Sequence, residues 1–171
     1  MIHKNIKLVL TLLIVVWSFY EFYQGHIGNG IFILLLAGLV LFFYFKNELL
    51  LLTFLKLRKQ DFDGAGRILD KIKKPSAVLV RKQEGYYNLI KGIITSRTNL
   101  TQSEKYLRRA VELGLNMKHD LAMAKLQLAG IAMTKRRKRE ATQLINEAKK
   151  LDKHGMLKDQ IKQLKDQLKR L

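Results

Sequence analysis

Cysteine is absent from this sequence of 171 residues, and proline occurs once, at Pro75. Without cysteine the chain has no disulfide framework, no thiolate nucleophile and no Cys-type metal site. A single proline leaves long helices uninterrupted. Sustained alternation of apolar and polar residues is also missing, so signals for strands are weak. These absences together predict an all-α protein.

Signatures of catalysis are missing as well. The histidines show no metal-ligand spacing with one another or with a carboxylate on one helix face. They are His3, His26, His119 and His154. Gly25, Gly28 and Gly30 lack the following Lys-Ser or Lys-Thr pair of a phosphate-binding loop. We therefore predict that the protein is not an enzyme, holds no metal and needs no cofactor.

Charge of one sign dominates the second part of the chain. Lys and Arg number 32 against 14 Asp and Glu, which gives a formal net charge of +18. In the first 50 residues the two signs are nearly balanced. A region as basic as the remainder is expected to attract polyanions: anionic lipid head groups, nucleic acid or an acidic protein.

Two apolar segments occupy the amino-terminal third, at about residues 6–23 and 31–46, joined by a glycine-rich loop at 24–30. Each is somewhat shorter than the roughly 20 residues of a full membrane span. Aromatic residues stand near their ends, where membrane interfaces favour them, and Lys46 follows the aromatic cluster Phe42–Phe45. We predict that residues 1–46 form a transmembrane helical hairpin.

Basic residues flank these two segments unequally. Lys4 and Lys7 precede the first, the loop has neither Lys nor Arg, and the region after the second is rich in both. The positive-inside rule then predicts an integral membrane protein with two spans, residues 6–46 in the lipid bilayer, and both termini and the soluble domain on the cytoplasmic side. A cleaved signal peptide at the first segment and a hairpin that dips into one leaflet are the alternatives.

The remainder of the chain repeats itself at an offset of about 38 residues. Four registers hold a small or apolar residue in all three copies: Leu52, Ile90 and Leu128; Ala65, Ser103 and Ala141; Leu69, Leu107 and Ile145; Ile72, Ala110 and Ala148. The copies occupy residues 47–75, 76–115 and 120–153 of a repeat region at 47–155. Each copy reads as two amphipathic helices.

Helix-breaking and helix-capping residues mark the expected ends of these helices. In the middle copy Thr98 and Asn99 interrupt the helical pattern, Thr101 to Glu104 has the spacing of a capping box, and Gly114 is placed as a carboxyl cap.

In the first copy Pro75 is expected to end the second helix, and Ser76 can cap the next helix. The first helix of this copy, around Leu49 to Lys59, follows the second apolar segment without a break signal. One long helix could therefore join the two.

These helix pairs resemble the tetratricopeptide repeat (TPR) family. The matching residues are Tyr87, Ile90, Ile94, Ser103, Leu107 and Ala110 in the middle copy, and Leu128, Ala132, Ala141, Ile145 and Ala148 in the last. The family's glycine is replaced by Lys91 and Ala129, and the period exceeds the usual ~34 residues. The resemblance implies a TPR-like helix-hairpin solenoid that binds a protein or peptide; a helix-hairpin repeat of another kind is the alternative.

The resemblance also implies a partner groove on the inner face of the first helices. Its residues would be Asn88, Gly92, Thr95, Met123, Leu126, Gly130 and Met133. Small residues leave room for a partner, and methionines adapt to varied apolar surfaces. The alternative is that these side chains pack against a neighbouring helix. The basic clamp with which some members hold carboxyl-terminal peptides is not reproduced.

A basic run is the most conspicuous polar feature, and it falls in the turn between the two helices of the last copy. It consists of Lys135, Arg136, Arg137, Lys138 and Arg139. A solvated turn without a ligand is one interpretation, and attraction to anionic lipid is another. Nucleic acid is disfavoured because no aromatic residues for base stacking are interleaved with the basic ones.

The last residues, 156–171, carry a narrow apolar seam of Leu157, Ile161, Leu164, Leu168 and Leu171. We interpret them as an amphipathic capping helix that covers the open end of the repeats. A coiled-coil dimer seam is the alternative, so the oligomeric state is left open.

The resulting functional hypothesis is a membrane-tethered scaffold or adaptor for protein–protein interaction that uses a cytoplasmic TPR-like domain. The alternative is a basic membrane-surface module that binds anionic lipid head groups or, as the less favoured ligand, nucleic acid.

Overall fold

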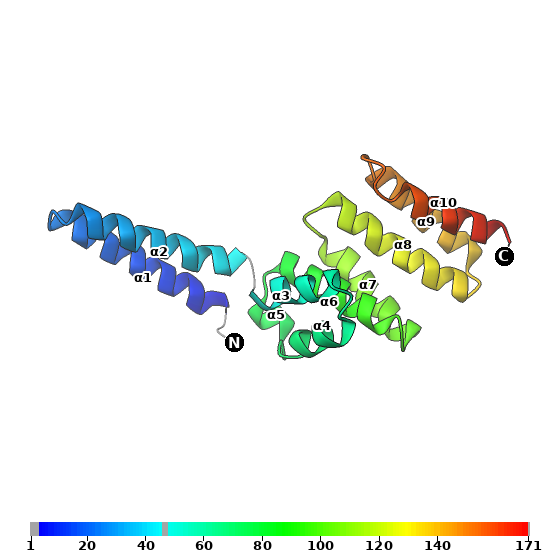
Figure 1. Cartoon of the computed structure of the whole chain (residues 1–171), viewed down its shortest axis with the longest axis horizontal. Coiled ribbons are helices and arrows are strands. Elements are labelled where there is room, and N and C mark those ends of the chain that lie inside the picture. Colours follow the sequence, from blue (N-terminus) through cyan, green and yellow to red (C-terminus); the bar gives the residue numbers. More distant parts are fainter. Residues whose placement is uncertain (1–3, 46–47, 171) are drawn as a thin grey trace. The chain divides into compact units, whose positions relative to one another are not determined.

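The computed structural model describes residues 4–45 and 48–170, which form ten α-helices and no strand (Figure 1). The predicted all-α fold is confirmed. The helices are α1 (Lys4–Tyr23), α2 (Ile27–Phe45), α3 (Glu48–Arg58), α4 (Phe62–Leu69), α5 (Pro75–Val78), α6 (Arg81–Thr95), α7 (Leu100–Leu113), α8 (Lys118–Thr134), α9 (Lys138–Leu151) and α10 (Lys158–Lys169). The chain divides into two compact units, residues 1–83 and 84–171.

Helices α1 and α2 form a hairpin in which small residues allow the backbones to approach closely. The buried hydroxyl of Ser18 donates a hydrogen bond to the carbonyl oxygen of Gly30 at 2.7 Å. A Cβ atom at Gly30 would lie 2.7 Å from Cε1 of Phe22, so the contact requires glycine. Ala37 is also buried. The predicted helical hairpin is therefore present.

Its predicted role as a pair of membrane spans is wrong. Among the described residues no helix is both long and apolar enough to cross a membrane. The physical reason is the shortness of the uninterrupted apolar runs: Lys7 and Glu21 bound the run in α1, and Asn29 precedes the run in α2. Both fall below the roughly 20 residues of a span. The prediction of a two-span integral membrane protein with cytoplasmic termini is corrected accordingly.

The same hairpin leaves many large apolar side chains exposed, including Trp17, Phe19 and Leu35 at 60%, 66% and 68%. Part of the predicted interfacial cluster lies outside the described residues: the side chains of Phe43, Tyr44 and Phe45, and the whole of Lys46. The proposed continuity between the second apolar segment and the first repeat also falls on residues 46–47, which are not described.

Helices α3 and α4 pack against each other and are joined through Asp61. Its carboxylate accepts a hydrogen bond from the backbone N–H of Gly64 at 2.8 Å, which caps α4, and forms an ion pair with Lys56 at 2.9 Å.

The prediction that Pro75 ends the second helix of the first copy is wrong. Helix α4 already ends at Leu69, and Pro75 begins the short helix α5. Ser76 lies inside α5, whose amino-terminal cap position is Lys74, so the predicted cap at Ser76 is wrong.

The break between α6 and α7 lies where Thr98 and Asn99 predicted it. Asn99 is the amino-terminal cap of α7, since its side-chain oxygen accepts a hydrogen bond from the N–H of Gln102 at 3.0 Å. The predicted capping box is wrong, because Thr101 is already inside the helix. Gly114 ends α7 with φ of +76°, as predicted.

The repeat registers of the sequence correspond to buried positions. Nine residues in three registers are at most 2% exposed: Ala65, Ser103, Ala141, Leu69, Leu107, Ile145, Ile72, Ala110 and Ala148. The remaining register is uneven, because Ile90 and Leu128 are buried whereas Leu52 is 48% exposed. Paired helices with matching buried registers are consistent with a helical solenoid.

Helix α8 carries buried apolar side chains on two faces because it lies between two hydrophobic clusters. One cluster, with α6 and α7, contains Leu89, Leu107, Ala110, Leu115, Ala124, Leu128 and Ile131. The other, with α9 and α10, contains Ala122, Leu126, Ala129, Ala132, Met133, Ala141, Ile145, Ala148, Leu157, Ile161 and Leu168. Burial on both sides makes α8 the central helix of the second unit.

Helix α10 packs on α8 and α9 through the predicted apolar seam. Leu157, Ile161 and Leu168 are buried in the second cluster, and Leu164 is partly buried against it. The seam is therefore used within the chain, as a capping helix requires, and these side chains are not available for a coiled coil. Leu171 lies outside the described residues.

Candidate functional site

The residues predicted to form a partner groove lie mostly in buried positions. Asn88, Leu126 and Met133 are 7%, 4% and 7% exposed. Gly92 is also buried, and a Cβ atom there would lie 2.7 Å from Cγ of Leu107. Leu126 and Met133 pack in the cluster with α9 and α10, and Gly92 lies against Leu107 of α7, as in the alternative that the sequence left open. The side-chain amide of Asn88 donates a hydrogen bond to the carbonyl oxygen of Glu84 within α6.

The other three predicted groove residues are half-buried. Met123 packs against both hydrophobic clusters, so its side chain contributes to the packing of α8 on its neighbours. Thr95 ends α6, and Gly130 has open space where a side chain would lie. Binding of a partner by these seven residues stays a prediction.

Two residues of the basic run, Lys135 and Arg137, form ion pairs with residues of the described chain. Lys135 and Arg137 bind the carboxylate of Glu104 on α7 at 2.7 and 2.8 Å. Arg137 also lies 3.1 Å from Glu140, and Arg108 bridges both carboxylates. Two of the five basic residues therefore stabilise the turn between α8 and α9 by tying it to α7.

This network changes the titration of Glu104. Hydrogen bonds from Arg137, then from Lys135 and Arg108, lower its pKa to about 2, although burial acts in the opposite direction. Hydrogen bonds from Arg108, the main cause, and from Arg137 lower the pKa of Glu140. The carboxylates are therefore charged over the whole physiological range.

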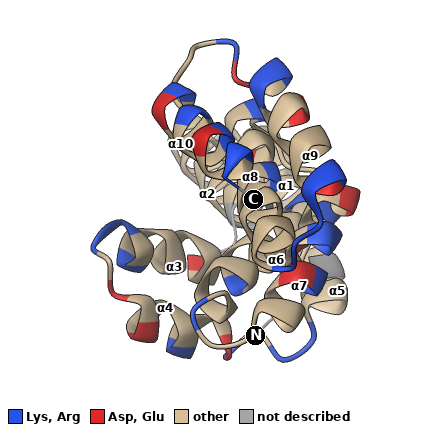
Figure 2. Ribbon diagram, turned by 90° about the vertical axis from the view of Figure 1, so that its right-hand side faces the viewer, with Lys and Arg blue, Asp and Glu red and all other residues tan. Residues whose placement is uncertain are grey.

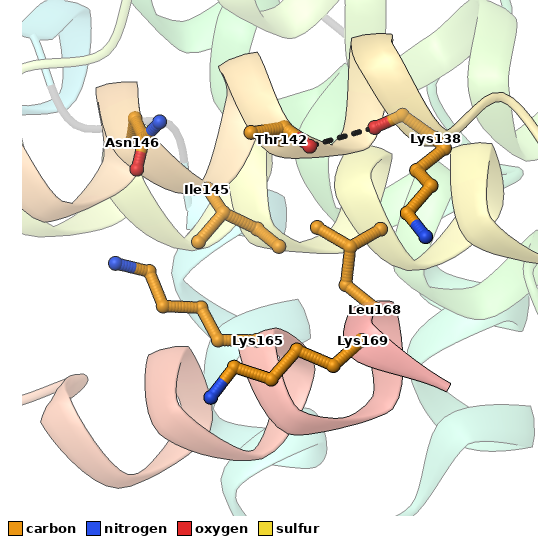
Figure 3. A pocket seen from close by; sticks show the side chains of 7 residues that line it. All are labelled: Lys138, Thr142, Ile145, Asn146, Lys165, Leu168 and Lys169. Carbon is orange, nitrogen blue, oxygen red and sulfur yellow. Dashed lines mark hydrogen bonds between the residues drawn. The ribbon is translucent and has the colours of Figure 1, made fainter. Parts of the chain in front are cut away.

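The other three residues of the run are Arg136, Lys138 and Arg139, and all are exposed. Among the described residues none of them forms an ion pair. Arg136 has φ of +58°, so it occupies the left-handed position that turns the chain between the two helices. Lys138 begins α9 and directs its side chain toward α10 (Figure 3).

An open groove of about 490 Å³ lies between α9 and α10. Helix α9 contributes Lys138, Thr142, Ile145 and Asn146, and α10 contributes Lys165, Leu168 and Lys169. Residues 142, 145 and 146 of α9 and residues 165, 168 and 169 of α10 follow the i, i+3, i+4 spacing of one helix face, and Lys138 lies four residues before Thr142. Figure 3 shows Ile145 and Leu168 directed toward each other across the groove. They are 1% and 9% exposed and form an apolar floor.

Lysine ammonium groups surround this floor, and the groove lining contains no carboxylate. Lys169 lies 3.7 Å from Asp166, an exposed pair that contributes little. Lys138 and Lys165 have no ion-pair partner among the residues that the structure describes. Basic residues recur along α9 and α10 in Figure 2. The groove therefore combines apolar contact with positive charge that no carboxylate in its lining compensates.

Polar groups complete the lining. The hydroxyl of Thr142 donates a hydrogen bond to the backbone carbonyl of Lys138 at 2.8 Å (dashed in Figure 3). That bond uses the backbone of Lys138 and leaves its ammonium group for a ligand. Asn146 is exposed at the edge and offers both a donor and an acceptor.

Sequence reasoning identified Lys138 but missed the remainder of this groove. The lysines at 165 and 169 flank the apolar seam of α10, and this flanking was the only available signal. Such lysines ordinarily cover the edge of a buried helix face. Their convergence with Lys138 depends on how α10 packs against α9, which the seam alone does not specify.

No group of three or more metal-binding side chains was found in the described part of the chain. Comparisons with models of protein families, with characterised proteins and with solved structures gave no match.

Proposed function

We propose that this protein is a non-enzymatic interaction module in which a TPR-like helix-hairpin solenoid binds a segment of another protein. The carrying observation is the groove between α9 and α10, which stays open after α10 has packed on α8 and α9. A concave apolar floor with a few polar groups at its edge is the usual composition of a binding site. Helical solenoids present such surfaces to partner proteins.

The packing around the groove supports this proposal, since a preorganised site loses less entropy on binding. Lys125 of α8 forms an ion pair with Glu147 of α9. On the far side of α8, the hydroxyl of Tyr86 donates a 2.6 Å hydrogen bond to Asp120. Apolar clusters on both faces fix the position of α8, on which α9 and α10 pack.

Site-specific photocrosslinking in the source cells tests the proposal. A photoreactive residue replaces Asn146 at the edge of the groove in the full-length chain, and the matched control carries it at Gln127, an exposed residue of α8 outside the groove. We expect a discrete protein adduct from position 146 that is absent from position 127. Adducts of equal pattern and yield from both positions, or none from position 146, would overturn the proposal.

A further inference from the structure

The groove lining brings together lysines from two helices that are separate in sequence. Lys138 lies at the first turn of α9, and Lys165 and Lys169 lie on successive turns of α10. Ammonium groups that share one groove repel each other, and a bound anion relieves this repulsion. The apolar floor between them adds burial of apolar surface to the attraction.

From this arrangement we infer that the groove selects an acidic protein segment that carries an aliphatic side chain flanked by carboxylates. This inference rests on the proposed function and specifies the chemistry of the partner. The aliphatic group contacts the accessible edge of Leu168 and the methylene stems of the lysines that line the groove. The carboxylates accept hydrogen bonds from the lysine ammonium groups, which are stronger than bonds between neutral groups.

The composition of the lining favours a protein segment over the other polyanions. Two side chains make the floor, which suits one or two aliphatic side chains but gives little contact for a long acyl chain. The lining contains no aromatic residue on which a nucleic-acid base could stack. It contains no arginine either, whose planar fork is the preferred partner of phosphate groups.

Fluorescence anisotropy with synthetic peptides tests the inference. The probe is a short fluorescein-labelled peptide of alternating Glu-Glu and Leu-Leu pairs, and its matched control has Gln in place of every Glu. The full-length protein is held in a non-ionic detergent, because α1 and α2 expose large apolar side chains. We expect the acidic peptide to bind about tenfold more tightly than the Gln peptide, and this preference to shrink as salt is raised.

Charge-matched variants locate the site. One variant combines Lys138→Gln, Lys165→Gln and Lys169→Gln in the groove. The control combines Lys149→Gln, Lys158→Gln and Lys162→Gln, which removes the same charge from exposed positions of α9 and α10 outside the groove. Circular dichroism checks that both retain helicity. The groove variant should lose about tenfold in affinity for the acidic peptide, and the control should lose less than about threefold.

Three outcomes would overturn the inference. Equal affinity for the acidic and Gln peptides would remove the charge selectivity. Equal losses of affinity for the acidic peptide in the groove variant and its control would show that binding depends on the net charge of the protein and not on the groove. Complete displacement of the peptide by detergent micelles containing anionic phosphatidylglycerol, without displacement by neutral micelles, would indicate lipid as the ligand. A crosslink from position 146 together with any of these results would leave the proposed function intact, whereas its absence would remove both.

Discussion

The hydroxyl of Ser103 donates a hydrogen bond to the carbonyl oxygen of Gly92 at 2.8 Å, and both residues are buried. The bond ties α7 to α6 at a point where the two helices approach closely. The approach is possible because Gly92 has no side chain, so that Leu107 fills the space beside it. One polar and one apolar contact thus fix the same helix pair.

Gly92→Ala should destabilise the protein by about 1–3 kcal/mol, because the new methyl group would lie 2.7 Å from Cγ of Leu107. The better helix propensity of alanine offsets only ~0.5–1 kcal/mol of this loss. Gly130→Ala is the matched control, since nothing lies within 4 Å of its Cβ position. It should leave stability unchanged or raise it. Chemical denaturation followed by circular dichroism measures both, and equal effects would contradict the role of the close approach.

Glu104→Gln should destabilise the folded state by roughly 1–3 kcal/mol at pH 7, because it removes charge-assisted hydrogen bonds from Arg137, Lys135 and Arg108. The pKa of Glu104 is lowered from 4.5 to about 2 on folding. Its contribution is therefore fully present above pH 4.5 and is lost as the pH falls toward 2.

The measurement is the difference in unfolding free energy between wild type and the Glu104→Gln variant across this range of pH. It should shrink steadily from pH 5 to pH 2. Glu112→Gln is the control: Glu112 is 68% exposed and pairs with Arg109 three residues away on the same helix. Its effect should stay within ~0.5 kcal/mol. A pH-independent difference for Glu104 would show that its ion pairs do not contribute in solution.

Tyr86→Phe should cost about 1–3 kcal/mol, because the hydrogen bond to the charged carboxylate of Asp120 is lost. Burial, followed by the hydrogen bond to Asp120, raises the pKa of Tyr86 to about 12 from its ordinary value of 10.0. The tyrosine therefore stabilises the fold fully below pH 10, and this contribution disappears as the pH rises toward 12.

Ultraviolet titration of tyrosine ionisation provides the measurement. The wild type should show a group that ionises near pH 12, and that group should be missing from the Tyr86→Phe variant. Tyr106→Phe, a change on α7, serves as the control and should retain it. If the late-ionising group persists in Tyr86→Phe, the hydrogen bond to Asp120 is not its origin.

Leu157→Ala should destabilise the second unit by about 2–5 kcal/mol, because this side chain is 3% exposed in the cluster shared by α8, α9 and α10. Met156→Ala is the neighbouring control, since Met156 is 69% exposed. It should change stability by less than ~0.5 kcal/mol. Thermal denaturation compares the two. Similar small effects would mean that α10 does not cap the cluster in solution.

Several elements of the fold could be read from local patterns. Asn99 and Gly114 bound α7 within a few residues of where the break and the cap were expected, because capping depends on neighbours in sequence. The capping box at Thr101 was wrong because Asn99, two residues earlier, caps the helix by accepting a hydrogen bond from the N–H of Gln102, so that Thr101 lies in the first turn. Helix ends are the least determined part of a helical pattern, since adjacent polar residues can serve equally well.

Composition was a weaker guide at the amino terminus. The apolar segments predicted a helical hairpin, which the structure contains, but also two membrane spans, which it does not support. Apolar content and helix length are separate requirements for a span. Lys7 and Glu21 shorten the uninterrupted apolar run inside α1, although the helix itself extends from Lys4 to Tyr23.

The sequence by itself determined the all-α class, the paired helices and three of the four buried repeat registers, because these depend on helical period and on nearby caps. Only the tertiary structure decided what the polar residues do. Glu104 and Arg137 are 33 positions apart, and their ion pair exists because α7 packs beside the turn before α9. The groove around Lys138 and Lys165 has the same origin in the packing of α10 on α9, since contacts between distant helices are set by the shapes of both surfaces.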